Sequence, residues 1–200
     1  MTGKPIPAPP LVLASRSASR RAMLDAAGVA YAVSPADIDE SALKTVMSGE
    51  HPAFIAEALA KAKALALRTE GLVLGSDSLV ECNGRMFDKP TDRIDAANHL
   101  RWFSGRLLNL HSAAALARDG QTIWSHAASA QLQLRPLSEE FIAHYLDAEW
   151  PAIAGCVGVF RIEGMGVQLF DRIDGDYFTI LGMPLLALLA ALRRFGQLPA

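Results

Sequence analysis

The dipeptide Asp119-Gly120 constrains the fold of this 200-residue chain more than any other feature, because two long strand-like stretches flank it. Residues 107–117 precede it and residues 122–134 follow it. An Asp-Gly pair readily adopts the left-handed backbone of a two-residue hairpin turn. The sequence therefore predicts an antiparallel pair of strands in the second half of the chain.

The first half of the chain instead alternates short apolar runs with helical patterns. Buried strands are predicted at 11–14, 30–33 and 72–77, with helices at 17–28 and 52–68 between them. Ser17 or Ser19 can cap the first helix, Gly28 can end it, and Pro52 suits the first turn of the second helix. Such alternation favours parallel strands. Together with the hairpin, it predicts an α/β fold with a mixed, twisted sheet flanked by helices.

The remaining segments complete this expectation. Helices are predicted from Thr91 or Asp92 to Phe103, from Ser138, and from Pro184. Further strand-like runs lie at 157–162, 167–173 and 178–181, while Asp174 and Asp176 are assigned to a turn. We expect residues 1–10 to form a flexible tail and residues 11–200 to form a single domain without a linker.

Composition excludes several classes of protein. With 51% hydrophobic and 20% charged residues, the chain has enough apolar side chains to form a core and is not intrinsically disordered. A net charge of -2 argues against a nucleic-acid coat or a polybasic membrane binder. Cys82 and Cys156 form no CxxC pair, and no apolar stretch approaches the length of a membrane span. We expect a soluble cytoplasmic domain that binds neither nucleic acid nor membrane.

Hydroxyl and guanidinium groups gather between the first strand and the first helix, at Ser15, Ser17, Arg20 and Arg21. A strand-to-helix turn directs free backbone N–H groups toward one point, and arginine adds a planar fork of donors for phosphate oxygens. The segment predicts a phosphate-binding loop, although it is neither a Walker loop nor a GxGxxG turn. The alternative is a capped helix with solvated arginines.

Two sets of carboxylates are candidates for acid–base or metal chemistry. Asp77 is expected at the carboxyl end of the buried strand 72–77, where ligands collect in open α/β sheets. Asp39 and Glu40 are expected in a loop. Together with Asp77 they could complete a site for a hard cation, since Mg²⁺ usually takes one or two protein carboxylates plus substrate phosphates. The alternative is that Asp77 caps a turn and that the loop carboxylates are solvated.

Three further residues complete the set of candidates. Lys61 follows Glu57 by four positions and should form a surface ion pair, whereas Lys63 lies off that helical face. Lys89 precedes a proline in a loop, and a lysine there is either solvated or a cation for phosphate. Glu163 lies in a glycine-flanked turn, where its carboxylate could read the donor edge of a base or simply be a turn residue.

Taken together, these segments resemble the Maf-like nucleotide pyrophosphatases over residues 11–196. The matching motifs, in the family's order, are Leu13-Ala-Ser-x-Ser-x-x-Arg-Arg21, Asp39-Glu40, Leu59-Ala-x-x-Lys63-Ala, Gly75-Ser-Asp77, Lys89-Pro90, Ser104-Gly105, Gly158-x-Phe-x-x-Glu163-Gly164, Gly175-Asp176 and Leu181-Gly-x-Pro184-Leu. The arginine pair falls one position later after Ser17 than in the dTTP/UTP branch, and Glu replaces Gln at position 163. In both respects the chain is more similar to the 7-methyl-GTP branch.

The resemblance implies a fold and an activity. The fold would be an α/β one with two lobes and a cleft between them, as in Maf and ITPase proteins, and often dimeric. The activity would split a nucleoside triphosphate between its α- and β-phosphates, giving the monophosphate and pyrophosphate, with Mg²⁺ or Mn²⁺ as the divalent cation. Such an enzyme would remove modified or non-canonical nucleotides, a house-cleaning role in nucleotide metabolism.

The resemblance also implies a role for each matching residue. Asp77 matches the proton acceptor, and Asp77 and Glu40 would hold the metal. Glu40, Lys63 and Lys89 match the catalytic charges of the cleft. The remaining matches are the substrate-binding residues Ser15, Ser17, Arg20 and Arg21 and the specificity residues Ser19, Ser78 and Glu163.

The chain departs from the family's pattern at positions that bear on base preference. Ala18 replaces a proline, and Ser19 and Ser78 are smaller than their counterparts, which would leave a roomier pocket. Cys156 stands where the dTTP/UTP branch has Lys. Two alternatives to a 7-methyl-GTP-like specialist stay open: a pyrophosphatase of broad base specificity, and a non-catalytic nucleotide-binding regulator of cell division. A DNA-binding role has little support in a slightly acidic chain.

Overall fold

A computed structural model describes residues 11–199, so the tail predicted at 1–10 lies outside the described residues. Its centre is a seven-stranded mixed sheet of order β2-β1-β3-β5-β6-β7, with β4 paired to β3. The strands are β1 (Leu11–Leu13), β2 (Tyr31–Val33), β3 (Val73–Cys82), β4 (Arg85–Phe87), β5 (Leu107–Arg118), β6 (Gln121–Leu134) and β7 (Phe170–Asp174). β1 is parallel to β2 and β3, and the other pairs are antiparallel, so the predicted mixed sheet is confirmed.

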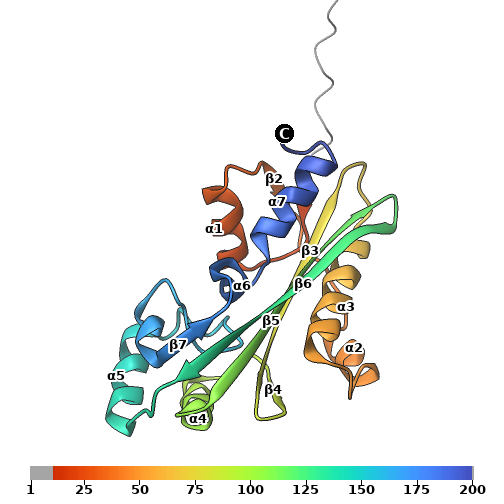
Figure 1. Cartoon of the computed structure of the whole chain (residues 1–200). Helices are drawn as coiled ribbons and strands as arrows, with labels where there is room; N and C mark the ends of the chain where they lie inside the picture. The colour runs from red at the N-terminus through yellow and green to blue at the C-terminus, as the bar shows by residue number, and fades with distance from the viewer. Residues whose placement is uncertain (1–10, 200) are drawn as a thin grey trace, which may run out of the picture.

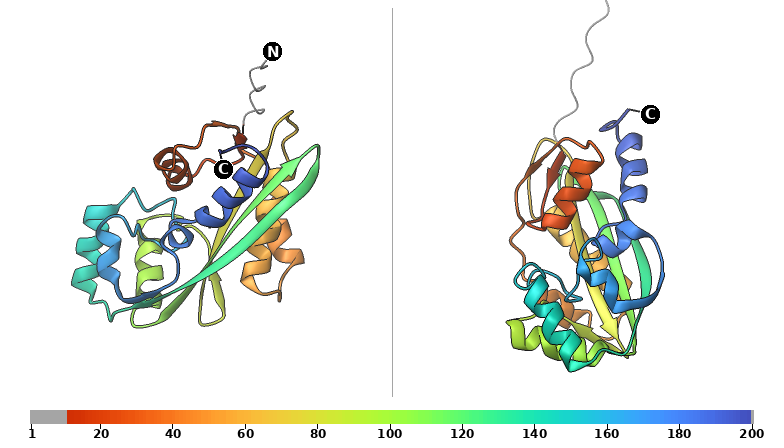
Figure 2. Two further views of the ribbon diagram at one scale, coloured as in Figure 1. Left: turned by 45° about the horizontal axis from the view of Figure 1, so that its top comes forward. Right: turned by 90° about the vertical axis from the view of Figure 1, so that its left-hand side faces the viewer.

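Helices cover both faces of the sheet and one of its ends (Figure 1). They are α1 (Ala18–Ala26), α2 (Glu40–Val46), α3 (Pro52–Leu65), α4 (Arg93–Phe103), α5 (Glu139–Glu149), α6 (Tyr177–Leu181) and α7 (Leu185–Arg194), with a 3-10 helix η1 (Met165–Leu169). α3 packs on β3, β5 and β6. α4 and α5 lie side by side at the end of the long hairpin away from its turn (Figure 2). None of the helices between residues 11 and 199 is long and apolar enough to cross a membrane.

The predicted hairpin is the longest pairing in the sheet, and it joins β5 to β6 from Leu107 to Leu134. Asp119 and Gly120 have φ angles of 52° and 75°, the left-handed values that the turn requires. The local helix signals were also correct. Ser17, Asp92 and Ser138 cap α1, α4 and α5, because each side chain accepts a hydrogen bond from a backbone N–H in the first turn.

The prediction that Asp77 lies at the carboxyl end of its strand was wrong. β3 does not end at residue 77 but continues to Cys82, because residues 73–81 all pair with β5. Asp77 therefore lies in the middle of the strand. The prediction that Asp39 and Glu40 lie in a loop was also wrong, because Asp39 caps α2 and Glu40 is the first residue of that helix.

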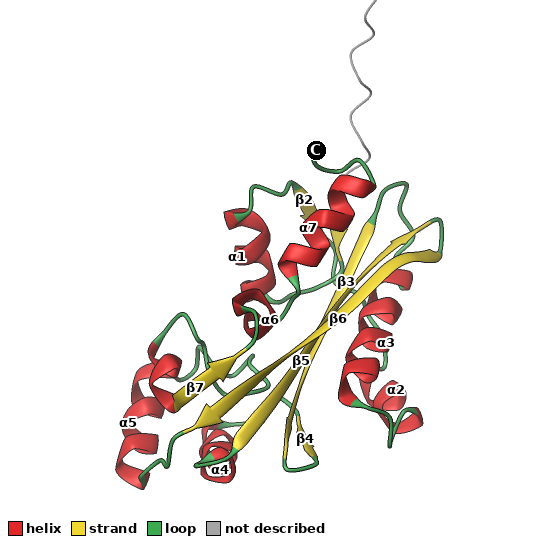
Figure 3. Cartoon of the chain, viewed as in Figure 1, coloured by secondary structure: helices red, strands yellow, loops and turns green. Residues whose placement is uncertain are grey.

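The C-terminal third contains more helix and less strand than predicted (Figure 3). Residues 157–162 form turns and irregular backbone instead of a strand, and of the predicted strand 167–173 only residues 170–173 are extended, within β7. Residues 178–181 belong to α6, because Asp176 accepts a hydrogen bond from the backbone N–H of Thr179 and so begins a helical turn. Short apolar runs do not distinguish a strand from a buried helical turn, and here tertiary contacts decide.

The core falls into three clusters of buried side chains. One joins α1 and α7 to β1, β3 and β5, and a second joins α3 to the opposite face of β3 and β5. The third lies around α4 and α5 at the far end of the hairpin. β3 passes through all three, and its polar segment Ser76, Asp77 and Ser78 lies where the first two give way to the third. The polar segment thus occupies the boundary between the two ends of the molecule.

Gly75 allows α3 to lie against β3 at unusually close range. A Cβ added at this position would lie 2.0 Å from the carbonyl oxygen of Ala60 and 2.5 Å from the backbone nitrogen of Ala64. These are backbone atoms of a long helix, so they cannot move aside locally. Because Asp77 follows Gly75 on the strand and Lys63 lies on this helix, the same contact fixes how near the two side chains can approach.

We expect Gly75→Ala to lower the free energy of unfolding by about 3 kcal/mol, because the new methyl group forces the helix away from the strand. Gly155→Ala is the matched control, since a Cβ there meets nothing within 4 Å. Urea unfolding of both variants measures the difference. Equal stability of the two variants would contradict the close packing of α3 on β3.

Candidate active site

The candidate site lies at an interruption in the sheet beside β3. β1 pairs with β3 only at Val73 and Leu74, and β4 pairs with it only from Val80 to Cys82. On this edge, residues 75–79 therefore have no neighbouring strand among the described elements, although β5 pairs along their other edge. An open edge lets side chains from both faces of a sheet meet around it. The polar residues of β3 lie within this interval.

On the α3 face, Lys63 joins two carboxylates. Its ammonium group lies 2.5 Å from Asp77 Oδ1 and 2.9 Å from Glu40 Oε1. The side chains of Lys63 and Asp77 are 11% and 9% exposed, whereas that of Glu40 is 45% exposed. The prediction that Lys63 is free of the Glu57–Lys61 surface pair is confirmed, because those two residues pair with each other at 2.7 Å. Lys63 instead points inward to the strand.

The electrostatics of Glu40 show that several cations surround it. Burial alone would raise its pKa, but its hydrogen bond to Lys63 and the charge of that lysine lower the pKa below the usual value. The charges of Lys44 and Lys89 act in the same direction. Glu40 is therefore held in its ionised form by cations from three different elements.

On the other face, Arg20 is buried, and each of the three nitrogens of its guanidinium group donates one hydrogen bond. Nε donates to the carbonyl oxygen of Gly182 at 3.0 Å, Nη1 to Ser15 Oγ at 3.3 Å, and Nη2 to Ser78 Oγ at 3.1 Å. Burial lowers the pKa of Arg20, while the charges of Asp77 and Glu40 oppose this change. Arg20 is thus oriented before any ligand arrives, and it lies within electrostatic reach of both carboxylates.

The carbonyl oxygen of Gly182 connects the C-terminal part of the chain to the site. Besides Arg20, it accepts hydrogen bonds from the hydroxyls of Ser76 at 3.3 Å and Ser78 at 3.0 Å. Ser78 Oγ also lies 2.9 Å from Ser112 Oγ, which donates to the carbonyl oxygen of Thr179 at 2.8 Å. Sequence reasoning missed Gly182 and Ser112 as site residues. The motif around Gly182 was noticed, but nothing local predicts a contact with Arg20.

The serines that precede Arg20 build the start of α1. Ser17 caps the helix, its backbone N–H donates to Ser15 Oγ at 3.2 Å, and its hydroxyl lies 3.0 Å from that of Ser19. Their hydroxyls therefore lie at the same helix N-terminus from which Arg20 extends. This arrangement agrees with the predicted phosphate-binding loop, since helix N-termini favour anions.

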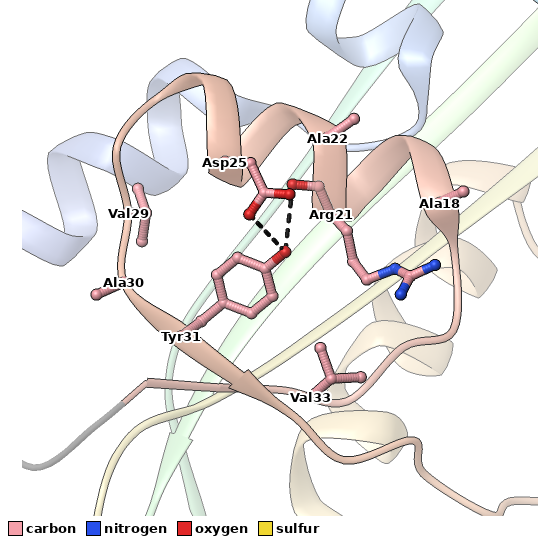
Figure 4. A pocket seen from close by; sticks show the side chains of 8 residues that line it. All are labelled: Ala18, Arg21, Ala22, Asp25, Val29, Ala30, Tyr31 and Val33. Carbon is pink, nitrogen blue, oxygen red and sulfur yellow. Dashed lines mark hydrogen bonds between the residues drawn. The ribbon is translucent and has the colours of Figure 1, made fainter.

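Arg21 does not share the contacts of Arg20. It is exposed and lines a surface hollow of about 610 Å³ between α1 and β2, where Tyr31 donates a hydrogen bond to Asp25 (Figure 4). A second hollow of the same size continues past Tyr31 along β2 toward the C-terminus. Neither hollow is lined by Asp77 or Lys63. Arg21 thus lies outside the buried cluster, with its guanidinium directed along α1 toward Ala18.

Lys89 and Glu163 are both exposed, and they lie in loops whose residues Phe87 and Ile162 pack in the third cluster, around α4 and α5. An ion pair between Lys44 of α2 and Asp88 ties the loop of Lys89 to the side of the site that carries Glu40. Burial, followed by the charge of Glu163, raises the pKa of the Cys156 thiol, which Lys89 opposes. Lys89 therefore lies within electrostatic reach of both Glu40 and Cys156, whereas no hydrogen bond or ion pair joins Glu163 to the site among the described residues.

The arrangement combines groups that bind an anion with groups that can accept a proton. Arg20, Lys63 and Lys89 supply positive charge, while Asp77 and Glu40 supply carboxylates. Each of the two carboxylates uses one oxygen for Lys63, and its second oxygen has no hydrogen-bond partner among residues 11–199. No group of three or more His, Cys, Asp or Glu side chains that could hold a metal occurs in that part of the chain.

The two adjacent arginines allow a direct test of this geometry. We expect Arg20→Lys to lower the free energy of unfolding by about 2 kcal/mol, because one ammonium group cannot replace three hydrogen bonds made by a planar guanidinium. Arg21→Lys is the control, and we expect a change of less than about 0.5 kcal/mol at this exposed position. Chemical denaturation of both variants provides the measurement. A smaller loss for Arg20→Lys than for its neighbour would refute the buried network.

Comparison with known proteins identifies the class to which this fold and site belong. A family model described as "Maf-like protein" matches residues 10–195. The chain belongs to this family, and the resemblance seen in its motifs is confirmed.

Two relatives show how near the similarity is. The chain is 46% identical over 195 residues to a 7-methyl-GTP pyrophosphatase of Rhizobium etli, covering 95% of this chain and 98% of the relative. It is 48% identical over 195 residues to a nucleoside triphosphate pyrophosphatase of Sphingopyxis alaskensis, covering 94% and 98%. The name of the first relative specifies 7-methyl-GTP, and the name of the second specifies only a nucleoside triphosphate.

Proposed function

We propose that this protein is a nucleoside triphosphate pyrophosphatase, which hydrolyses the α–β phosphoanhydride and yields the monophosphate and pyrophosphate. One observation carries the proposal: the oriented Arg20 and the Lys63–Asp77–Glu40 group lie around the same open edge of β3. The names of the relatives support the same reaction.

The cations have distinct tasks in this proposal. Arg20 and Lys63 are held in place by buried contacts, so they bind phosphate oxygens without further loss of side-chain freedom. Lys89 is exposed and adds charge near Glu40. The start of α1 completes the phosphate-binding surface with the hydroxyls of Ser15 and Ser17, and Arg21 extends it at the exterior.

Asp77 is the general base in this proposal. Lys63 fixes Oδ1, and one lone pair of the second oxygen accepts a proton from the attacking water, which leaves its other lone pair for a cation. The water oxygen forms a bond to the α-phosphorus, the bond from that phosphorus to the bridging oxygen breaks, and pyrophosphate leaves with the bonding electrons. Arg20, Lys63 and Lys89 stabilise the charge that accumulates on the leaving group.

The residues present fit a divalent cation. Asp77 and Glu40 each keep one carboxylate oxygen available beside Lys63, and Mg²⁺ is commonly held by one or two carboxylates together with substrate phosphates. We propose that these two residues hold Mg²⁺ or Mn²⁺. Such a cation would neutralise phosphate charge and make the α-phosphorus more electrophilic. Because Lys63 already bridges the two carboxylates, it also limits their repulsion before the cation binds.

Base selection is proposed to depend on Ser19, Ser78 and Glu163. The Glu163 carboxylate is exposed and can accept hydrogen bonds from the donor edge of a base. Ser78 binds Arg20 and Gly182, so any effect of this residue on specificity would act through Arg20. A preference for 7-methyl-GTP is supported by the name of the Rhizobium etli relative, and broad base specificity is the alternative.

We also propose that the protein acts in the cytoplasm. Cys82 and Cys156 are both free thiols, as is usual in a reducing compartment.

We expect Asp77→Asn to lower kcat for pyrophosphate release by about 100-fold or more while leaving much of the nucleotide affinity, because the amide cannot accept the proton of water. Asp25→Asn is the control, since Asp25 lies in the exposed hollow beside Tyr31. Turnover and binding are measured on the same protein. Near-normal turnover of Asp77→Asn would exclude it as the base. A wild-type protein that binds nucleotide without releasing pyrophosphate, with metal supplied, would favour the regulatory alternative.

We expect a chelator to abolish pyrophosphate release and added Mg²⁺ or Mn²⁺ to restore it. Glu40→Gln should raise the metal concentration needed for half-maximal rate several-fold, because one of two proposed carboxylate ligands loses its charge. Glu50→Gln, an exposed change just beyond the end of α2, is the control. Full activity in the presence of the chelator would refute the proposed cation.

A further inference from the structure

We propose that Glu149 is a positioning residue for base selection, which it performs by fixing the loop that carries Glu163. This inference rests on the proposed function, because it concerns which nucleotide that site accepts. Glu149 is the last residue of α5 and belongs to none of the motifs of the family resemblance. It is one of the few buried carboxylates of the chain, with 5% of its surface exposed.

Both oxygens of Glu149 hold the loop, one on each side of Glu163. Oε2 accepts a hydrogen bond from Nε of Arg161 at 2.9 Å and forms an ion pair with Nη2, also at 2.9 Å. Oε1 accepts a hydrogen bond from the backbone N–H of Met165 at 3.0 Å. Arg161 and Met165 lie two positions before and two positions after Glu163. A single carboxylate therefore ties down both flanks of the residue proposed to read the base.

The loop needs such an anchor because no regular secondary structure holds it. Between α5 and η1, residues 150–164 form turns and irregular segments. Val159 within this loop has φ of 57°, which is strained for a β-branched residue and persists only where the surroundings enforce it. Tyr145 of α5 supplies a second tie by donating its hydroxyl hydrogen to the carbonyl oxygen of Val159 at 3.0 Å. Helix α5 thus contacts this segment at three residues, namely Val159, Arg161 and Met165.

Close packing leaves little room for the loop to shift. A Cβ at Gly164 would lie 3.0 Å from Glu149 Oε1 and 3.4 Å from Nη2 of Arg161, so glycine lets the backbone next to Glu163 rest on this ion pair. The hydrogen bond from Arg161 to Glu149, together with the attraction of the two charges, raises the pKa of Arg161. The removal of one partner therefore leaves the other without its contact.

The consequence for function follows from the position of Glu163. Its side chain is exposed and has no hydrogen-bond partner among the described residues, so the anchored backbone is what limits the region that its carboxylate can reach. A site discriminates between bases when its polar groups can pair with the matching base and are left unpaired by the others. If Glu149 is lost, the backbone on both sides of Glu163 can shift, the carboxylate reaches a wider region, and the contrast between bases that match it and bases that do not match it falls.

The test compares nucleotide selectivity in matched variants of the full chain. The kcat/KM for pyrophosphate release is measured on GTP, 7-methyl-GTP, ATP, UTP and CTP, and selectivity is the ratio of the best to the poorest substrate. The wild type is compared with Glu163→Ala and Glu149→Gln. The control is Glu139→Gln, which breaks the exposed ion pair with Arg101 at the other end of the same helix.

We expect Glu163→Ala and Glu149→Gln each to reduce the selectivity ratio by about tenfold, since each removes the same polar discrimination. Glu139→Gln should leave the ratio unchanged. A purely structural role of Glu149 would lower kcat/KM on every nucleotide by the same factor and leave the ratio intact. That result overturns the inference, as does a ratio that Glu163→Ala fails to change.

A second variant keeps the test valid if Glu149→Gln folds poorly. Glu149→Gln combined with Arg161→Met removes both charges, so no unpaired guanidinium remains in the loop. We expect this double variant to recover thermal stability but not selectivity, and recovery of selectivity would overturn the inference. A wild type that releases no pyrophosphate from any nucleotide refutes the proposed function itself. An active wild type whose selectivity is unaltered by either Glu149 variant refutes only the role of Glu149.

Discussion

The contact between Lys63 and Asp77 is the constraint on which the rest of the site depends. Two opposite charges buried on a helix and a strand cost desolvation energy, and their mutual attraction seldom yields net stability. They can meet only because Gly75 lets α3 approach β3 to backbone contact. A charged pair at an interface where a helix and a strand are in backbone contact contributes little to stability. Such pairs concentrate at functional sites, where their chemistry is needed.

The strand around Asp77 explains how groups from distant parts of the sequence converge. Alternate residues of β3 face opposite sides, so Asp77 meets Lys63 on one face while Ser76 and Ser78 meet the Gly182 carbonyl on the other. Residues 75–79 have no neighbouring strand on one edge, so Arg20 can hydrogen-bond to Ser78 and to the Gly182 carbonyl while it lies within electrostatic reach of Asp77. Orientation of Arg20 therefore depends on a carbonyl group 162 positions away, and the site forms only when the whole sheet has formed.

Local signals in the sequence predicted the hairpin at Asp119-Gly120 and narrowed two helix caps to adjacent candidates, of which the structure uses Ser17 and Asp92. Turn and cap chemistry is decided by neighbouring residues, so such signals can be found in the sequence. The motifs singled out Arg20, Lys63, Asp77 and Glu40, and the structure brings these four together. The misassigned segments 157–162 and 178–181 are short apolar runs whose form depends on tertiary contacts. Ser112, Gly182 and Glu149 were missed since their partners lie far along the chain or in an irregular loop.

The charge of the buried cluster also bears on how a triphosphate could be held. Arg20 and Lys63 are balanced by Asp77 and Glu40, so the buried cluster has no excess positive charge of its own. A triphosphate therefore needs compensation from outside the cluster. The cations proposed to give it are exposed, namely Lys89, whose charge acts on Glu40, and Arg21 of α1. Buried residues would then set the geometry of the reaction, while exposed cations and a divalent ion would supply the charge for binding. Because the two tasks belong to different residues, nucleotide affinity could change without a change in the position of the reacting groups.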